Sequence, residues 1–274
     1  MYLTIRGVVL RVTDYNDRDA ILTILSQAHG KLTVKARGLR RKNSPLIAPC
    51  QLLAYGEFTL FEYREQYTVH EARSLELFQG LRNELTRLCL GTYFAQVCEL
   101  VSQEDLPSSE LLSLLLNCLF ALSEMKMQEL FVKAVFELRV ACIAGFTPAL
   151  FGCHVCGNPE PDRFDLSAGE LECSDCRSGG EGIRIPVTPG VLEAMRYISL
   201  CDPKKLFSFR IGRDNLVKLS ALTEAYLATQ TEKSFFALNF YKSLFQDTYY
   251  PEIEKTLKMT EANKKVLLKT LRAV

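Results

Sequence analysis

The chain has 274 residues, of which 48% are hydrophobic and 24% are charged, and its formal net charge is +1. This is ordinary globular composition, enough for one large domain or two to three small ones, and global charge this close to zero says nothing about partners. The sequence has no signal-peptide pattern at its start and no apolar stretch long enough for a bilayer, so we expect a cytoplasmic protein with no membrane partner.

The first eighty residues or so have the pattern of a small β domain. Short runs rich in Val, Ile, Leu, Thr, Tyr and Phe alternate with turn residues. The expected strands cover positions 3–12, 20–25, 31–37, 52–63 and 67–74. About five strands joined by hairpins predict a small closed barrel, with the OB-fold as the first candidate and an SH3-like barrel as the second.

A cationic surface is predicted on this barrel. Positions 28–45 contain six basic residues and no Asp or Glu. In the strand at 31–37, the two-residue period puts Leu32, Val34 and Ala36 on one face, toward the core. The other face is cationic, and a basic loop that we expect to be flexible extends it. The candidate phosphate contacts are Lys31, Lys35, Arg37, Arg40, Arg41 and Lys42.

This surface favours nucleic-acid binding, because a row of cations neutralises phosphates and releases their counterions. Exposed aromatic side chains on the same barrel would add stacking platforms for bases. The aromatic residues of this region, some of which must belong to the core, are Tyr2, Tyr15, Tyr55, Phe58, Phe61, Tyr63 and Tyr67. The alternative is an ordinary solvated basic face.

Near residue 81 the hydrophobic period changes from that of strands to that of helices. We expect helices over about 81–100, 110–124 and 127–144, the second of which is apolar nearly all round and so central to a bundle. Thr188 and Pro189 form a good helix start for a segment that reaches position 199. Further helices are expected over 214–229 and 232–245, and an amphipathic one in the tail from 251 to 274.

Four cysteines form the most specific motif of the chain, C-x2-C-x16-C-x2-C, made by Cys153, Cys156, Cys173 and Cys176. Each C-x-x-C puts two sulfurs on one tight turn, and two such turns that face each other make a tetrahedral thiolate cage. The spacing predicts one structural Zn²⁺ ion. The alternatives are two disulfides or four unrelated buried thiols. His154 stands between two better ligands and is expected at the surface.

Motifs of catalysis are missing. The sequence has no phosphate-binding loop, no serine nucleophile elbow, no zinc-deaminase signature and no H-E-x-x-H. Four thiolates close the coordination shell of zinc and leave no position for a water molecule, so the ion would hold the fold. We therefore predict that the protein is not an enzyme; a zinc-dependent hydrolase of nucleic acid is the least favoured alternative.

The order of barrel, basic loop, helical middle and C-x2-C…C-x2-C insertion resembles the RecO family of DNA repair proteins, which are bacterial recombination mediators. The resemblance covers residues 1 to about 246 and does not include the tail. The segments that carry it are Gly38-Leu39-Arg40-Arg41-Lys42-Asn43-Ser44, Gly145-Phe146-Thr147-Pro148 followed by Cys153-His154-Val155-Cys156-Gly157, Cys173 to Gly180, and Lys242-Ser243-Leu244.

For the fold, the resemblance implies an α+β protein. A five-stranded OB-fold would occupy residues 1–80, and a helical domain residues 81–150 and 181–246. A zinc module is expected at 151–180 and a helical tail at 247–274.

For the function, the resemblance implies a protein of recombinational DNA repair that binds single- and double-stranded DNA and anneals complementary strands. It would also help to load RecA onto strands coated by the single-strand-binding protein, SSB. The implied partners are RecR and the C-terminal tail of SSB, and the implied location is the cytoplasm, at the nucleoid. The alternative is a zinc-ribbon scaffold that acts mainly through protein–protein contacts, with the apolar helix at 111–122 as its docking surface.

Overall fold

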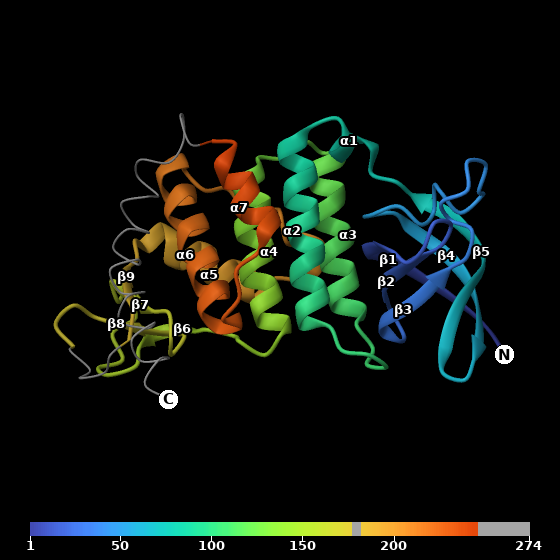
Figure 1. The fold of residues 1–274 in the computed structure, drawn as a ribbon. Coiled ribbons are helices and arrows are strands. Elements are labelled where there is room, and N and C mark those ends of the chain that lie inside the picture. The colour runs from blue at the N-terminus through green and yellow to red at the C-terminus, as the bar shows by residue number, and fades with distance from the viewer. Residues whose placement is uncertain (177–181, 246–274) are drawn as a thin grey trace, which may run out of the picture. The chain divides into compact units, whose positions relative to one another are not determined.

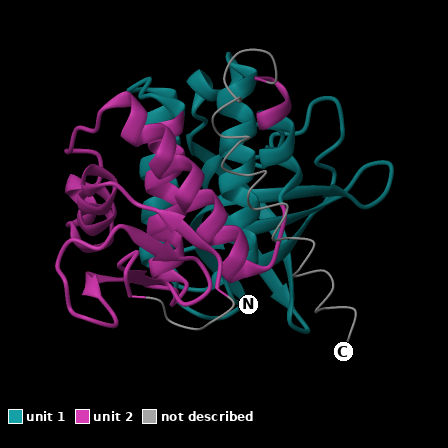
Figure 2. Ribbon diagram, turned by 90° about the vertical axis from the view of Figure 1, so that its left-hand side faces the viewer, with its two compact units in different colours: residues 1–129, 235–241 teal, residues 130–234, 242–274 magenta. Residues whose placement is uncertain are grey.

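The computed structural model describes residues 1–176 and 182–245. The chain divides into two compact units, one of Met1–Glu129 with Phe235–Tyr241 and one of Leu130–Ser234 with Lys242–Val274 (Figure 2). The domain boundaries expected from the sequence remain predictions, and the expected tail helix lies outside the described residues. In the part of the chain that is described, no helix combines the length and apolar character needed to cross a membrane.

A closed five-stranded barrel begins the first unit (Figure 1). Its strands are β1 (Tyr2–Asp14), β2 (Ala20–Ser26), β3 (Gly30–Ala36), β4 (Tyr55–Tyr63) and β5 (Gln66–Glu76), in the order β1-β2-β3-β5-β4. All neighbours pair antiparallel except β3 and β5, which run parallel. This is the Greek-key barrel of an OB-fold and confirms the predicted fold.

The barrel core follows the alternation of its strands. Leu32, Val34 and Ala36 of β3 are all buried, as the two-residue period predicts. β4 begins at Tyr55 rather than at position 52, because Leu53 has a left-handed φ of 65° and its N–H donates to the Val9 carbonyl oxygen. Leu53 and Ala54 therefore bond to Val9 of β1 from a turn and do not lengthen β4.

The helices of the first unit are α1 (Gln79–Arg82), α2 (Leu85–Val101), α3 (Ser109–Ser123) and most of α7 (Phe236–Ser243). The helix expected over 81–100 is thus two helices. α2 packs against β1 and β2, and α3 against β2. Most apolar side chains of α3 are buried, as expected for a central helix, whereas Phe120 is exposed. α7 begins later than predicted, because Glu232 ends the preceding helix with a left-handed φ of 53°.

The second unit contains most of α4 (Glu129–Ile143), α5 (Pro189–Leu200), the short 3-10 helix η1 (Pro203–Lys205) and α6 (Arg213–Thr231). Thr188 caps α5 as predicted, since its Oγ1 accepts from the Val191 N–H at 3.4 Å. A small sheet of order β6-β8-β7-β9 also lies here, formed by β6 (Ala149–Cys153), β7 (Arg163–Asp165), β8 (Glu170–Glu172) and β9 (Arg184–Pro186). These strands are too short to show alternation in the sequence.

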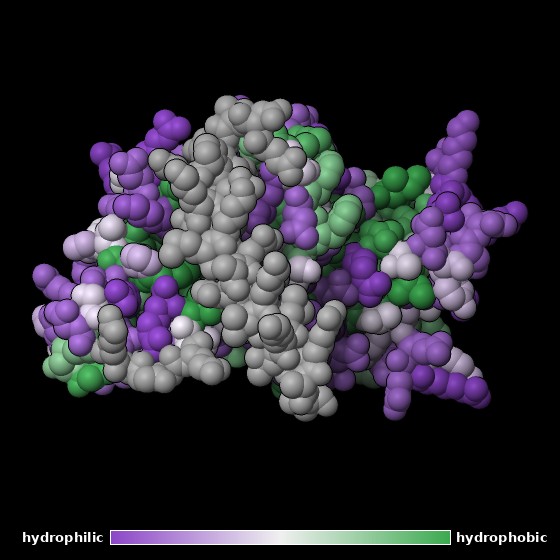
Figure 3. Space-filling view, turned by 60° about the vertical axis from the view of Figure 1, so that its left-hand side comes forward, coloured by the Kyte–Doolittle hydropathy of each residue, from purple (hydrophilic) through white to green (hydrophobic). Residues whose placement is uncertain are grey.

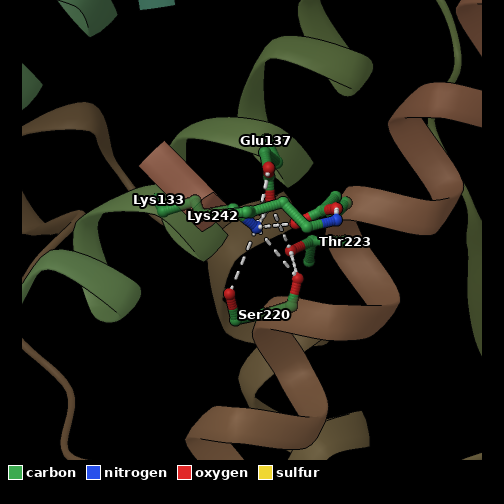
Figure 4. A network of polar contacts seen from close by, with 6 residues as sticks. Lys133, Glu137, Ser220, Thr223 and Lys242 are labelled. Carbon is green, nitrogen blue, oxygen red and sulfur yellow. Dashed lines mark hydrogen bonds and ion pairs between the residues drawn. The ribbon is translucent and has the colours of Figure 1, made fainter. Parts of the chain in front are cut away.

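A buried ionic network joins α4, α6 and the last turn of α7 (Figure 4). Lys133 is 1% exposed, and its Nζ lies 2.9 Å from both Glu137 Oε1 and Glu224 Oε2. Glu224 also accepts from Lys242 Nζ at 2.6 Å, and Glu137 from Thr223 Oγ1 at 2.8 Å. Burial would lower the pKa of Lys133, but the two carboxylates outweigh it and raise the pKa. The network therefore keeps a lysine charged inside the helices.

Replacement of Lys133 by methionine should lower the free energy of unfolding by about 3–5 kcal/mol, because it leaves buried carboxylates without their cation. Chemical unfolding followed by circular dichroism measures this change. The matched control is Lys218→Met on the exposed side of α6, which should change the free energy by less than about 0.5 kcal/mol. Equal effects of the two substitutions would contradict the role given to Lys133.

Candidate functional site

The four cysteines of the motif meet at one edge of the small sheet. Cys153 ends β6, and Cys173 follows β8 directly. Because β6 and β8 pair in parallel, both strands end at the same edge. A tight turn follows each strand: the Gly157 N–H donates to the Cys153 carbonyl at 2.9 Å, and the Cys176 N–H to the Cys173 carbonyl at 3.1 Å. The four Sγ atoms, including that of Cys156, lie within 4.8 Å of one another.

This donor set fits a tetrahedral metal ion. Four sulfurs bound to zinc at about 2.3 Å stand roughly 3.8 Å apart, and Cys156 Sγ and Cys173 Sγ are 3.8 Å apart. Burial opposes ionisation of Cys153, but the backbone N–H groups of Cys156, Cys173 and Val155 outweigh it and lower its pKa to about 6. A hydrogen bond with Cys156 is the largest of the effects that raise the pKa of Cys176 to about 12. A divalent cation would stabilise all four thiolates together.

Groups beside the cluster hold the sulfurs in place. Asn158 Nδ2 donates to Cys173 Sγ at 3.3 Å, and the Cys173 N–H donates to Cys153 Sγ at 3.4 Å. His154 Nδ1 lies 3.1 Å from the Leu171 carbonyl oxygen and does not join the sulfurs, in keeping with the surface position predicted for it. All ten cysteines lie in the described part of the chain, and none of them forms a disulfide there.

Helices α5 and α6 anchor the sheet that carries the cysteines. Arg196 of α5 donates from Nε to the Leu150 carbonyl at 2.7 Å, and Gln230 of α6 donates to the Leu166 carbonyl at 2.8 Å. Phe164, which is fully buried, packs edge-on against the ring of Tyr226. An ion bound by the thiols would therefore stabilise a segment that is already fixed to the helices, which is the work of a structural metal.

The predicted phosphate contacts on β3 are already engaged by neighbours. Lys31 Nζ donates to the Glu99 carbonyl oxygen of α2 at 3.0 Å. Lys35 Nζ lies 3.7 Å from Asp19 Oδ2 and 4.3 Å above the centre of the Tyr15 ring. Lys31 is thus tied to a helix end, whereas Lys35 stays on the outer face beside an exposed aromatic ring.

The other four predicted contacts, Arg37, Arg40, Arg41 and Lys42, are all exposed. Arg40 is paired with Asp14, with 3.3 Å between its guanidinium nitrogen and the carboxylate oxygen. For Arg37, Arg41 and Lys42, no ion pair is present among the described residues. These three exposed cations can therefore meet a phosphate without first breaking an ion pair.

The composition of the basic loop suggested that it is flexible, but the structure shows its backbone bonded to the barrel. Leu39 and Leu46, which flank its charged residues, are buried in the barrel core. The Gly38 N–H donates to Asp19 Oδ1 at 2.8 Å, and this bond is the main cause that lowers the pKa of Asp19. The Arg40 N–H donates to the Arg18 carbonyl at 3.1 Å. The cations therefore project from a defined backbone.

The turn between β1 and β2 also belongs to this surface, and the prediction from positions 28–45 did not include it. It brings Asp14 and Asp19 next to the basic loop and adds the exposed Arg18. The hairpin register is the signal that could have found it: Ala20 pairs with Ala36, so the residues before and after them are neighbours as well. The surface is therefore less positive than the predicted row of six cations.

The barrel aromatics range from the core to the surface, with Tyr55 and Tyr67 half-buried. Phe58 is fully buried, whereas Tyr2, Tyr15, Phe61 and Tyr63 are exposed. One view of the surface shows hydrophilic side chains that project from the barrel region, with hydrophobic patches between them (Figure 3). Exposed rings and exposed cations thus share the outside of one barrel, which is the combination that single-strand binders use.

Comparisons with known proteins assign both parts of the chain to one family. Residues 1–78 match the family described as "Recombination protein O N terminal", and residues 82–238 match "Recombination protein O C terminal".

Three relatives, each named "DNA repair protein RecO", illustrate how much of the chain is shared. The one from Acetivibrio thermocellus is 34% identical over 246 residues, which are 89% of this chain and 97% of the relative. The one from Rubrobacter xylanophilus is 33% identical over 71% of this chain and 79% of its own. The one from Heliobacterium modesticaldum is 27% identical over 94% of this chain and 96% of its own.

Loss of one cysteine of the cluster should release the metal. Elemental analysis of the purified protein should find one zinc ion per chain in the wild type and none in Cys153→Ser or Cys176→Ser, with lower soluble yield because the module loses its tie. Cys201→Ser is the matched control, since Cys201 is a half-buried thiol outside the cluster. Full zinc content and full stability in either cluster variant would show that the cage is assigned wrongly.

Proposed function

The chain belongs to the RecO family of DNA repair proteins, and we propose that it acts without catalysis as a mediator that binds single- and double-stranded DNA. It would anneal complementary strands and help to load RecA onto strands coated by SSB. Its partners would be RecR and the C-terminal tail of SSB, and it would work in the cytoplasm, at the nucleoid. The cysteine cluster would hold one structural Zn²⁺.

The observation that carries the proposal is the group of exposed cations on the outside of the barrel. Arg37, Arg41 and Lys42 follow β3, beside the turn between β1 and β2. In OB-folds, the face of the second and third strands and the loop between the first and second bind oligonucleotides. Their position beside this turn supports the proposed contact with DNA.

Annealing needs no more chemistry than this surface supplies. Two complementary strands repel each other because both are polyanions, and a cationic surface that holds them lowers this repulsion. Base pairing then provides the driving force. No phosphate-binding motif for nucleotide hydrolysis is present in the sequence, and four thiolates around one ion leave no position for a reacting water.

The scaffold alternative has less support. It places a docking groove on the apolar helix at 111–122, but α3 buries most of the side chains concerned, among them Leu111, Leu115 and Leu119, and exposes Phe120. A helix whose apolar side chains are mostly buried in the core of its own unit offers little apolar surface to a partner protein. Protein contacts of a mediator would have to use other parts of the surface.

Neutralisation of the unpaired cations should weaken DNA binding and its dependence on salt. The triple variant with Arg37, Arg41 and Lys42 changed to Gln should flatten the slope of log K against log salt for single strands by about 0.7 per lost contact. Fluorescence anisotropy with a labelled oligonucleotide measures the slope, and the annealing rate of complementary oligonucleotides should fall with it. Arg40→Gln alone should flatten the slope by less than this amount per contact, because Arg40 is already paired with Asp14.

The matched control removes the same number of charges from the second unit, by changing the exposed Lys204, Lys205 and Lys218 to Gln. It should leave the slope unchanged. The proposal is wrong if the wild-type protein ignores oligonucleotides at low ionic strength, or if both triple variants flatten the slope equally.

A further inference from the structure

One row of outward-facing residues crosses four strands of the barrel. Lys35 of β3 is in register with Thr68 of β5, Thr68 with Phe61 of β4, and Phe61 with Tyr2 of β1. With strands about 4.8 Å apart, the backbones of Lys35 and Phe61 are separated by roughly 10 Å along the sheet. A few nucleotides can span that distance, so the row connects the cationic side of the barrel with its aromatic side.

Three rings come together at the far end of this row. The centres of the Tyr2 and Phe61 rings are 5.4 Å apart, and those of Tyr2 and His70 are 5.1 Å apart. All three side chains stay open to solvent, with Tyr2 58% and Phe61 40% exposed. We call these three residues the aromatic cluster.

His70, the third ring of the cluster, lies at a β-bulge of β5. Leu60 pairs with Val69 and Thr59 with Glu71, so His70 has no partner on β4. Val69 is buried in the barrel core, and the next residue, His70, is exposed with its ring beside that of Tyr2. Bulges are common next to functional sites, and this one coincides with the ring that completes the aromatic cluster.

The turn next to the cluster holds its backbone in a costly conformation. Arg64 and Glu65, between β4 and β5, both have left-handed φ angles, 49° and 60°. Such a two-residue turn normally takes Asn and Gly, and other residues there are strained. The strained turn places the Arg64 guanidinium 5.2 Å from the centre of the Tyr63 ring, in cation–π contact. A cation and a further exposed ring thus flank the aromatic cluster.

We propose that the aromatic cluster of Tyr2, Phe61 and His70 is a stacking subsite for unpaired bases. This inference rests on the proposed DNA binding and assigns different roles in it to the cations and to the rings. The cations after β3 hold the phosphates of any DNA, and the cluster at the other end of the row selects single strands. Arg64 provides a phosphate contact at that end, and the Tyr15 ring, over which Lys35 Nζ lies, is a further ring along the path.

The selection follows from what each form of DNA exposes. In a duplex the faces of the bases are covered by their neighbours in the stack, so an aromatic side chain finds no partner. In a single strand each base has a free π-face, and stacking on an aromatic side chain contributes to binding without any preference for sequence. The cluster therefore favours single strands of any sequence, as a mediator on exposed strands requires.

Cross-strand stabilisation is the competing role for these rings, because aromatic pairs that face each other on neighbouring strands also strengthen a sheet. That role is confined to folding and would not distinguish single strands from duplex. The two roles therefore give different results in a binding experiment, even where a substitution also lowers stability.

The test compares single-stranded and duplex DNA on the same variants. The double variant Tyr2→Leu/Phe61→Leu keeps apolar side chains on the strands but removes the rings. Its affinity for a single-stranded oligonucleotide should fall by about 5- to 30-fold, whereas its affinity for duplex and its salt slope should stay at the wild-type values. A 2-aminopurine base in the oligonucleotide should be quenched on binding to the wild type and less so on binding to the variant.

Controls separate failure of this inference from failure of the proposed function. Tyr2→Phe should behave as wild type because it retains the ring. His70→Ala removes an exposed side chain at the rim of the cluster and should lower single-strand affinity even if the double variant does not fold. Phe236→Ala removes another exposed ring of the first unit and should change neither affinity. If the wild type binds DNA but the cluster variants lose the same affinity for both DNA forms, or lose none, the subsite alone is wrong. No binding by the wild type overturns both proposals.

Discussion

The pairing of β3 with β5 is the constraint on which the nucleic-acid surface depends. Only two residue pairs make it, Val34 with Tyr67 and Lys35 with Thr68. Because the pairing is parallel and closes the barrel, it sets a strand that carries cations beside strands that carry rings. The inward residues of the same strands, such as Val34 and Val69, are buried in the core. If a strand slipped by one residue, its cations and rings would turn inward and its apolar side chains outward. The hydrophobic core therefore also fixes the register that holds the cations and rings on the outside.

The cysteine module depends on a parallel pair in the same way. β6 and β8 end at one edge, and each then enters a tight turn that presents two thiols. Gly157 ends the first turn with a φ of 74°, a conformation that most side chains would strain. The strands of this segment are short, so an ion held by four thiolates would add stability to that of their packing against the helices. A metal used in this way contributes to shape and not to a reaction.

Local patterns predicted much of this protein. The alternation at 31–37 assigned the buried face of β3 correctly, and the cysteine spacing identified the four side chains that meet. Non-local pairing was beyond those patterns. The sequence window around the basic loop contains no acid, yet Asp14 and Asp19 reach it through the hairpin, and Lys31 is engaged by the end of α2. The bulge at His70 is equally invisible, because it exists only relative to the partner strand.

Protection of backbone amides from hydrogen exchange, measured with and without a single-stranded oligonucleotide, tests the central claim most directly. If the outside of the barrel binds DNA along the row described, protection should rise in the turn at 14–19, the loop at 37–42 and the segment from Phe61 to His70. The second unit should show little change at the same oligonucleotide concentration. Protection confined to the second unit, with none on the barrel, would contradict the assignment of this surface.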